Sequence, residues 1–440
     1  MTATKNILVI GGGVAGIQAS LDLADKGINV YLVEREPSIG GIMALLDKTF
    51  PTNDCSICIL APKMNECFAN PNIRILTNSE LISLEGEAPD FRATIVKKAR
   101  FVDEKKCTGC GDCTQKCPVK VPNKYNMNLD KRKAIYLPFP QSVPRIMTID
   151  KERCLKFTKD KCGNCIKVCK AGAIDYEQND EKIVLDVGAV IVASGFEIYN
   201  PSDMFEYGYG KYSNVKTAME YERLICASGP TGGHLVVEPG GERPKRLGFI
   251  QCVGSRDLSR KNPYCSSVCC MHATKEAMLA KEHYDDIETY IFFLDLRAVG
   301  KNFQQYVDRA KKDYGIKYLR ARPGRIMENE EKGTLTIWYD DLIDPHIQSI
   351  DVDMVVLCTA LMPSSTAPKM GEILGIELDE YGFFCAKDPL ANPVCSTKKG
   401  IFIAGYCAGP KDIPESVAEA SGASARASEV IAQSGGGDVP

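Results

Sequence analysis

The sequence predicts an α/β protein with two Rossmann-like dinucleotide-binding domains, one of them interrupted by a small cysteine-rich insertion. Three observations predict this class. A glycine loop follows an apolar strand at the start of the chain, a second strand–loop–helix unit begins at Pro244, and two cysteine runs separate stretches that both belong to the first domain. Alternating strands and helices are typical of a parallel sheet covered by helices.

The first strand–loop–helix unit carries a dinucleotide-binding fingerprint. The apolar strand Ile7–Ile10 precedes the loop, a helix continues through Lys26, and a second strand spans Asn29–Val33. The loop has a G-x-G-x-x-G spacing formed by Gly11, Gly13 and Gly16. Glycines there allow a tight turn and a close approach to a pyrophosphate, whose charge then lies at the helix N-terminus. Glu34 follows the second strand, where a carboxylate accepts ribose hydroxyls.

A glycine pair shortly after Glu34 favours FAD over NAD. Gly40 and Gly41 resemble the E-R-x-x-x-x-G-G continuation of two-dinucleotide-binding-domain flavoproteins, in which a second backbone segment approaches the same ligand. An ordinary loop is the alternative interpretation. A helix-like segment, Ile42–Lys48, follows.

Length and composition limit the class of protein. A chain of 440 residues has room for two or three domains. The net charge of −3 argues against nucleic-acid binding. We expect no membrane insertion and no signal peptide, because no apolar run reaches the ~18 residues of a membrane span and the first such run is the Rossmann strand. The 20 cysteines indicate metal ligation in a reducing, anaerobic cytoplasm.

The strongest signal is the pair of cysteine runs in the insertion. The first has the spacing C-x2-C-x2-C-x3-C-P, and the last three cysteines of the second keep C-x2-C-x3-C, as in bacterial ferredoxins. In such proteins the fourth cysteine of each run ligates the other cluster. We therefore expect one [4Fe–4S] cluster on Cys107, Cys110, Cys113 and Cys169. We expect another on Cys154, Cys162, Cys165 and Cys117. Seven residues separate Cys154 from Cys162 instead of two, which could weaken or expose the second cluster.

The insertion divides the first domain. After it, Ala189–Ser194 leads to Gly195 and resembles the strand at which such flavoproteins cross to their second dinucleotide domain, and Ala360–Pro363 resembles the crossing back. The predicted organisation is an FAD domain in three parts, with the ferredoxin-like insertion, a second Rossmann-like domain and a disordered tail. The FAD domain is predicted over residues 1–100, 181–243 and 363–434. The ferredoxin-like insertion is predicted over 101–180, the second Rossmann-like domain over 244–362 and the tail over 435–440.

The second domain carries cysteines where a pyridine-nucleotide enzyme has glycines. Its first strand, Leu247–Val253, is followed by no G-x-G-x-x-G, so we expect that NAD(P)H does not bind there. The loop and the start of the next helix, predicted over Ala273–Tyr284, carry Cys252, Cys265, Cys269 and Cys270. From spacing alone these could form a cluster site, a redox disulfide or structural thiols. Lys275 could reach a flavin edge or be a solvated surface lysine, and spacing favours the second.

Two further regions bear on the flavin. Cys55 and Cys58, on a C-x2-C spacing, and Cys67 could be a dithiol facing the flavin, part of a further cluster or buried thiols. Near the C-terminus a strand ends in Gly405 and is followed by a helix, whose dipole stabilises reduced flavin. This helix is predicted over Ile413–Gln433. Tyr406 stands where many related flavoproteins place an Asp that holds the ribityl chain. The four histidines show no ligand spacing.

Taken together, these motifs resemble the A-type subunits of heterodisulfide reductases. The resemblance covers nearly the whole chain and includes the stretches 54–64, 248–256 and 264–271. It implies a thioredoxin-reductase-like, two-dinucleotide-binding-domain flavoprotein with an inserted two-cluster ferredoxin domain. It also implies a third [4Fe–4S] cluster, held by the four cysteines of the second domain, and a catalytic place for Lys275 beside the FAD.

The resemblance implies an oxidoreductase component in which FAD takes electron pairs and releases them singly into the clusters. Family members use this arrangement for flavin-based electron bifurcation. The implied partners are B- and C-type subunits, hydrogenase or dehydrogenase modules, ferredoxin and a second copy of the A-type chain, all in the cytoplasm. Two alternatives stay open. One is a relay component of a quinone-interacting membrane complex, and the other is an NAD(P)H-dependent flavoprotein oxidoreductase.

Overall fold

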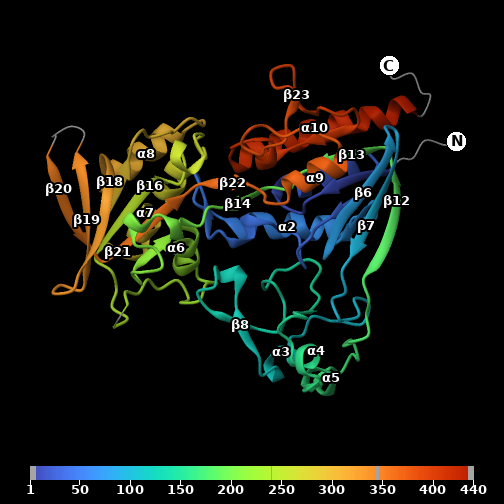
Figure 1. The fold of residues 1–440 in the computed structure, drawn as a ribbon, viewed down its shortest axis with the longest axis horizontal. Helices are drawn as coiled ribbons and strands as arrows, with labels where there is room; N and C mark the ends of the chain where they lie inside the picture. Colours follow the sequence, from blue (N-terminus) through green and yellow to red (C-terminus); the bar gives the residue numbers. More distant parts are fainter. Residues whose placement is uncertain (1–5, 239, 342–345, 435–440) are drawn as a thin grey trace. The chain divides into compact units, whose positions relative to one another are not determined.

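The computed structural model describes residues 6–238, 240–341 and 346–434, so the predicted tail at 435–440 lies outside the described residues. The chain divides into two compact units (Figure 1). The chain leaves the first unit within β14 (Phe196–Ile198) and returns within β22 (Leu361–Pro363), and these two strands pair. The first unit comprises Met1–Ala44, Cys58–Phe196 and Pro363–Pro440, and the second comprises Leu45–Ile57 and Glu197–Met362.

The first unit is built on a seven-stranded sheet of order β23-β24-β25-β13-β1-β2-β5. The strands from β25 to β5 are parallel, because helices or long crossovers connect them. The two strands beside β1 are, like β1 itself, mostly apolar and buried, as expected of a sheet covered on two faces. The strands are β1 (Asn6–Ile10), β2 (Asn29–Val33), β5 (Ile73–Leu76), β13 (Ala189–Val192), β23 (Ala386–Asp388), β24 (Asn392–Ser396) and β25 (Ile401–Ile403).

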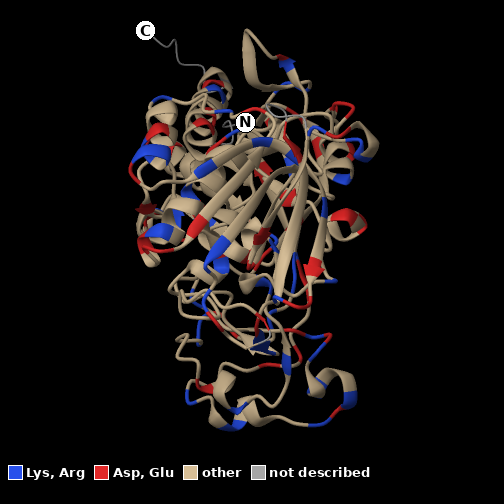
Figure 2. Cartoon of the chain, turned by 90° about the vertical axis from the view of Figure 1, so that its left-hand side faces the viewer, with Lys and Arg blue, Asp and Glu red and all other residues tan. Residues whose placement is uncertain are grey.

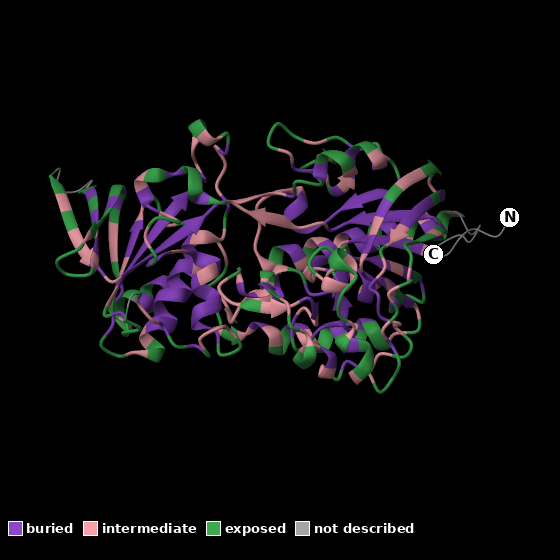
Figure 3. Cartoon of the chain, turned by 60° about the horizontal axis from the view of Figure 1, so that its bottom comes forward, coloured by how far each residue is buried: buried purple, intermediate pink, exposed green. Residues whose placement is uncertain are grey.

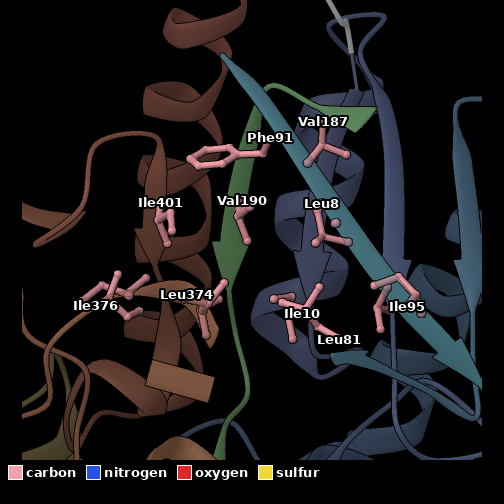
Figure 4. Packing of buried hydrophobic residues seen from close by; sticks show 14 of the residues in the cluster. Leu8, Ile10, Leu81, Phe91, Ile95, Val187, Val190, Leu374, Ile376 and Ile401 are labelled. Carbon is pink, nitrogen blue, oxygen red and sulfur yellow. The ribbon is translucent and has the colours of Figure 1, made fainter. Parts of the chain in front are cut away.

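Helices and a second sheet cover the faces of this sheet. α1 (Val14–Ala24) packs beside α10 (Ile413–Ser434), where the Ser421 hydroxyl donates to Asp22 at 2.6 Å. An antiparallel sheet of β6 (Ser79–Glu87), β7 (Asp90–Lys97) and β12 (Glu181–Val187) contributes to the same core. Figure 4 shows this packing, with side chains from both sheets and from α9 (Ala367–Leu374) in one buried cluster.

The cysteine-rich insertion leaves and re-enters the first unit at one sheet edge. Lys97 of β7 pairs with Glu181 of β12, so the intervening chain begins and ends side by side. A small core of apolar and cysteine side chains fills the insertion. Its elements are short, and they are α3 (Asp112–Lys116), β8 (Lys120–Pro122), β9 (Lys131–Lys133), β10 (Ile135–Tyr136), β11 (Thr148–Ile149), α4 (Leu155–Lys159) and α5 (Asn164–Val168).

The second unit has its own seven-stranded sheet, of order β15-β21-β16-β17-β18-β19-β20. The strands from β15 to β18 are parallel, and a β18–β19–β20 meander extends the sheet. In Figure 3 the central strands and α7 are buried along most of their length. The strands are β15 (Val215–Thr217), β16 (Arg246–Val253), β17 (Glu288–Phe293), β18 (Lys317–Asn329), β19 (Thr334–Asp341), β20 (Ile347–Val352) and β21 (Met354–Thr359). The main helices are α6 (Ala218–Ile225), α7 (Cys269–His283) and α8 (Phe303–Lys312).

Predicted helix bounds differ from the structure at several points. α1 ends at Ala24 rather than at Lys26. α7 begins at Cys269 rather than at Ala273, because the cysteine pair forms its first turn. The segment predicted as helix-like over Ile42–Lys48 is instead a 3-10 turn, Ile42–Leu45, followed by β3 (Lys48–Thr49). β3 pairs with β4 (Asp54–Cys55), and α2 (Ser56–Ala69) follows. Pairing in a hairpin, which sequence periodicity does not reveal, prevents the helix from continuing. No helix among the described residues has both the length and the apolar character to cross a bilayer.

Replacing Arg100 by Met is expected to lower the free energy of unfolding by about 3 kcal/mol. The buried guanidinium donates to Glu104, Thr148, Thr77 and the Pro37 carbonyl, so its loss leaves several buried acceptors without a donor. Urea unfolding measures the change. The control is Arg92→Met, which removes an exposed pair with Asp186 and should cost under about 1 kcal/mol. Equal costs for both variants would contradict this account.

Candidate cofactor sites

The glycine loop of the first unit has the geometry of a dinucleotide cradle. A Cβ added to Gly16 would lie 1.8 Å from the Gly11 carbonyl oxygen, so only glycine allows α1 to begin this close to β1. The Gly40 amide donates to the Gly12 carbonyl at 2.7 Å, and a Cβ on Gly41 would lie 2.9 Å from the Gly13 Cα. The two predicted glycine segments therefore meet. Their bare backbone beside the start of α1 fits a pyrophosphate.

Glu34 lies directly behind this cradle. Its carboxylate is buried and accepts from the Gly12 amide at 2.6 Å and from the Glu36 amide at 2.8 Å. Burial raises the pKa of Glu34, while these two amide donors act against that shift. The side chain thus fixes the loop, and its remaining acceptor capacity is available to ribose hydroxyls.

The remaining predicted flavin residues lie at the carboxyl ends of neighbouring strands. Gly195 follows β13 and has φ +68°, and Gly405 follows β25 and has φ +76°. The Gly405 amide donates to Glu419 of α10 at 3.0 Å. Tyr406 is buried, and its ring packs against Phe196 at 4.6 Å. Ligands of open α/β sheets bind at this carboxyl edge, next to the glycine loop of β1.

The insertion gathers the thiols of its two cysteine runs. In the first predicted set Cys113 is buried, Cys110 is exposed, and Cys107 and Cys169 are partly buried. Burial, with smaller contributions from the nearby thiols of Cys107 and Cys110, raises the pKa of the Cys113 thiol to about 11. Buried neighbouring thiols resist ionisation by themselves, whereas a cationic metal centre between them would favour the thiolate forms.

The second predicted set lines a small pocket. All four of its cysteines, Cys117, Cys154, Cys162 and Cys165, contribute to the wall together with apolar side chains and Tyr176. The Tyr176 hydroxyl lies 2.8 Å from the Cys165 sulfur. When that sulfur is a metal-bound thiolate the hydroxyl must donate, and such a bond tunes the potential of a cluster. No sequence pattern indicated Tyr176, which comes from outside the cysteine run.

Four thiols of the second unit meet between β16 and α7. Cys252 lies near the end of β16 with φ +60°, Cys265 lies in the loop, and Cys269 and Cys270 form the first turn of α7. Burial raises the pKa of Cys269 well above its ordinary value, and the thiols of Cys270, Cys252 and Cys265 add to the shift. The positive end of the α7 dipole faces the same group and favours bound negative charge.

A fifth thiol, which sequence spacing did not indicate, adjoins this group. Cys358 on β21 is fully buried, and burial together with the thiols of Cys269, Cys270 and Cys252 raises its pKa well above the ordinary value. Because β21 is adjacent to β16 only in the folded sheet, no local spacing could have predicted it. The sulfur environment of the site is therefore larger than the four cysteines predicted.

Lys275 belongs to a buried charge network. Its ammonium lies 2.5 Å from Glu222 of α6 and 3.0 Å from Glu276, and it donates to the Lys48 carbonyl at 3.0 Å. Both carboxylates and the lysine are fully buried. The ligand atoms of Glu222, Glu276 and His272 lie within 4.8 Å of one another, and the Lys275 ammonium already supplies a cation to them. Lys275 is thus not the solvated lysine that spacing favoured.

The two carboxylates of this network differ in charge. Burial raises the pKa of Glu276 well above its ordinary value, and the adjacent Glu222 adds to the shift. Burial opposes ionisation of Glu222 as well, but Lys275 lowers its pKa to about 2. Burial works against the ammonium, yet Glu222 and Glu276 raise the pKa of Lys275. The network therefore contains an ion pair between Lys275 and Glu222, while Glu276 is the carboxyl group that resists ionisation.

The other cysteines near the flavin motif differ in their bonding and burial. Cys55 and Cys58 are disulfide-bonded. Cys67 is a buried thiol 3.8 Å from the Ile17 carbonyl, and burial raises its pKa to about 12. Of the three interpretations of these residues, a buried thiol therefore fits Cys67, while Cys55 and Cys58 are not free thiols.

Two family models match parts of the chain. Residues 6–47 match the FAD dependent oxidoreductase family, and residues 100–123 match the 4Fe-4S binding domain. These matches confirm FAD and [4Fe–4S] clusters as the cofactors predicted from the glycine loop and from the first cysteine run.

Curated relatives match almost the whole chain. Identity is 50% to an A-type iron–sulfur subunit of the CoB–CoM heterodisulfide reductase of Methanopyrus kandleri, over 98% of this chain and 65% of that protein. Identity is 48% to the corresponding protein of Methanocaldococcus jannaschii, over 98% of this chain and 64% of that protein. Identity is 42% to the A-type component of the ferredoxin:CoB–CoM heterodisulfide reductase of Methanosarcina mazei, over 98% of this chain and 53% of that protein. The chain thus spans less than two thirds of the length of these relatives.

Solved structures confirm the predicted fold class. The thioredoxin reductase of Lactococcus lactis has a TM-score of 0.52 and 14% identity, with 97% of this chain and 99% of that chain covered. The thioredoxin reductase of T. acidophilum has a TM-score of 0.51 and 13% identity, with 98% and 99% covered. At these identities the likeness concerns the fold alone.

Two single-glycine variants should separate folding from FAD binding. Gly16→Ala is expected to destabilise the apoprotein by about 3 kcal/mol, because the added methyl meets the Gly11 carbonyl. Gly13→Ala is the matched control, since its Cβ meets no described atom within 4 Å, but the methyl would face the bound phosphate. Thermal unfolding of apoprotein and flavin content after reconstitution measure both effects. Full FAD occupancy in both variants would contradict the cradle.

The buried network predicts that two isosteric substitutions lower the free energy of unfolding by very different amounts. Glu222→Gln removes the counter-charge of Lys275 and should cost about 3–5 kcal/mol at pH 7, whereas Glu276→Gln replaces a protonated acid and should cost about 1 kcal/mol or less. Because the pKa of Glu276 is raised on folding, its contribution to stability is complete below pH 4.5 and falls as the pH rises above it. Urea unfolding across pH tests both points. Glu276→Gln should remove that fall, and an unchanged pH profile would contradict the assignment.

Proposed function

We propose that this chain, a relative of the A-type iron–sulfur components of CoB–CoM heterodisulfide reductases over almost its whole length, is the electron-transfer hub of a multisubunit oxidoreductase. When bound, FAD supplies the exchange between electron pairs and single electrons, and [4Fe–4S] clusters supply the single-electron steps. The family matches to both cofactor classes support this proposal. The residues below would hold the cofactors.

The first unit would hold the FAD. The glycine segments 11–16 and 40–41 leave room for the pyrophosphate, Glu34 fixes the loop, and Gly195, Gly405 and Tyr406 border the same edge of the sheet. Lys275 belongs to the second unit, and its role at the flavin is what the family resemblance implies. Its complete burial in an ion pair supports a functional role over a surface one.

Three cysteine sets would hold three clusters. Two lie in the insertion, on Cys107, Cys110, Cys113 and Cys169 and on Cys117, Cys154, Cys162 and Cys165. The third lies in the second unit on Cys252, Cys265, Cys269 and Cys270. Each set combines at least one buried thiol with others that are exposed or partly buried. This arrangement protects a cluster from water while leaving an edge for electron exchange.

The observation that carries the proposal is the content of the loop between β16 and α7. In a pyridine-nucleotide enzyme this loop holds the nucleotide pyrophosphate against glycine backbone. Here four thiols gather in that place. The second unit is therefore built for single-electron transfer rather than for hydride transfer from NAD(P)H.

The partners and the final reaction follow from the relatives and are proposals for this chain. The names of two relatives contain both ferredoxin and the CoB–CoM heterodisulfide. We infer B- and C-type subunits, a hydrogenase or dehydrogenase module, ferredoxin and a second copy of this chain as partners in the cytoplasm. Splitting of electron pairs between ferredoxin and a disulfide is the reaction this assembly would perform.

An anaerobic reductive titration tests the hub proposal. NADH and NADPH should leave the visible flavin absorbance unchanged, while a low-potential single-electron donor should bleach it and develop reduced-cluster EPR signals. Cys269→Ala should lose about four iron atoms per chain and keep its FAD, because the glycine cradle belongs to the other unit. Stoichiometric bleaching of the flavin by NADPH would overturn the proposal in favour of a pyridine-nucleotide oxidoreductase.

A further inference from the structure

The insertion is basic on a chain that is otherwise acidic. Residues 101–180 contain sixteen Lys and Arg against ten Asp and Glu, a net charge of +6, so the rest of the chain has −9. Most of this excess lies in residues 151–170, which carry seven basic and two acidic residues. Figure 2 shows blue segments, with fewer red ones, on the short elements at the bottom of the view, where the insertion lies. The charge is therefore concentrated around the second cysteine run.

The basic side chains of this run face solvent. Their counter-charges are few, because Asp160 already pairs with Lys156. Among the described residues no ion pair neutralises the four exposed lysines around Cys162. We call these four the lysine rim, and they are Lys159, Lys161, Lys167 and Lys170. Four unpaired positive charges on twelve consecutive residues create a local field that attracts acidic surfaces.

Along the chain the lysine rim lies on both sides of two cysteines of the second thiol pocket, Cys162 and Cys165. Cys162, one of the four cysteines of that pocket, is exposed and lies directly after Lys161. Ile166, the residue between Cys165 and Lys167, is 49% exposed. An apolar residue inside a charged rim is the usual composition of a protein docking site. A cluster on these thiols would therefore have its accessible edge inside the basic surface.

The chemistry of the surface favours a protein over a nucleic acid. Single-stranded nucleic acids bind through aromatic rings on which bases stack. The aromatic residue of this run, Phe157, is partly buried and packs against Phe101 at 4.4 Å and Tyr176 at 5.4 Å. It is not free to stack on a base. The combination of lysines, an exposed cysteine and an apolar centre fits a redox partner with an acidic face.

We propose that a small acidic single-electron carrier protein of the ferredoxin type docks on the lysine rim and exchanges its electron with the cluster on Cys117, Cys154, Cys162 and Cys165. The proposal rests on the proposed function, because the exchange requires that cluster. One electron passes between the two clusters, so one is oxidised as the other is reduced, and no bond is formed or broken. The second cluster is thus the exchange point with a diffusible carrier.

A charge-reversal experiment on the anaerobic holoprotein tests this. The rim variant is Lys161→Glu, Lys167→Glu and Lys170→Glu, and the matched control is Lys105→Glu, Lys124→Glu and Lys131→Glu, three exposed lysines of the same domain outside the rim. The affinity for an acidic two-cluster ferredoxin is measured at low and high salt. At low salt the rim variant should bind at least about tenfold more weakly and the control within about threefold, and high salt should remove the difference.

The result is interpreted together with iron content and EPR spectra. If the rim variant retains its iron and binds the ferredoxin like the control, the docking proposal is wrong while the hub proposal stands. If the unsubstituted protein itself lacks the second cluster, the hub proposal fails. Should the rim variant fold poorly, Lys→Gln at the same three positions should weaken binding by an intermediate factor. Tight, rim-dependent binding of duplex DNA or of anionic vesicles in place of ferredoxin would also overturn the proposal.

Discussion

A thiolate cannot remain charged in a buried site without a compensating cation, and this constraint governs both units of the structure. Cys113, Cys269 and Cys358 are all placed where burial and neighbouring thiols raise their pKa values. Protons or iron can satisfy such groups. The fold brings the thiols together in sets and points the N-terminus of α7 at one of them, which favours a metal centre over isolated protonated thiols.

The same constraint explains the neighbourhood of the third thiol set. α7 presents its cysteines in its first turn and Lys275 and Glu276 about one turn later. The ammonium is balanced by Glu222, and burial together with Glu222 disfavours ionisation of Glu276, which limits negative charge beside the thiols. An ionised Glu276 would repel an anionic cluster. Burial of a neutral acid and one ion pair therefore lets charged cofactor chemistry occur in a dry interior.

Much of the fold could be predicted from the sequence because its signals are local. Gly11 and Gly16 allow a turn in which any side chain would meet the backbone, and the cysteine spacing indicated the insertion. The pocket lined by Cys117 with Cys154, Cys162 and Cys165 contains the four residues predicted for the second cluster. The assignment of these four cysteines to one cluster stays a prediction.

What escaped prediction depends on contacts between distant segments. Glu222 reaches Lys275 from another helix, and Cys358 and Tyr176 approach their thiols across strand and loop packing. The segment Leu45–Ile57 belongs to the second unit although it follows the flavin motif directly, and its β3–β4 hairpin replaced an expected helix. Lys275 was favoured as a surface residue from spacing, because a helical position does not reveal which partners cover it.

The central claim is that thiolate-bound iron occupies the loop between β16 and α7. Crystals of anaerobically purified protein, measured on both sides of the iron absorption edge, test it most directly. The account predicts three anomalous peaks per chain, one of them enclosed by Cys252, Cys265, Cys269 and Cys270, with about twelve irons in total. A loop without an iron peak, or one occupied by a pyridine nucleotide, would contradict it.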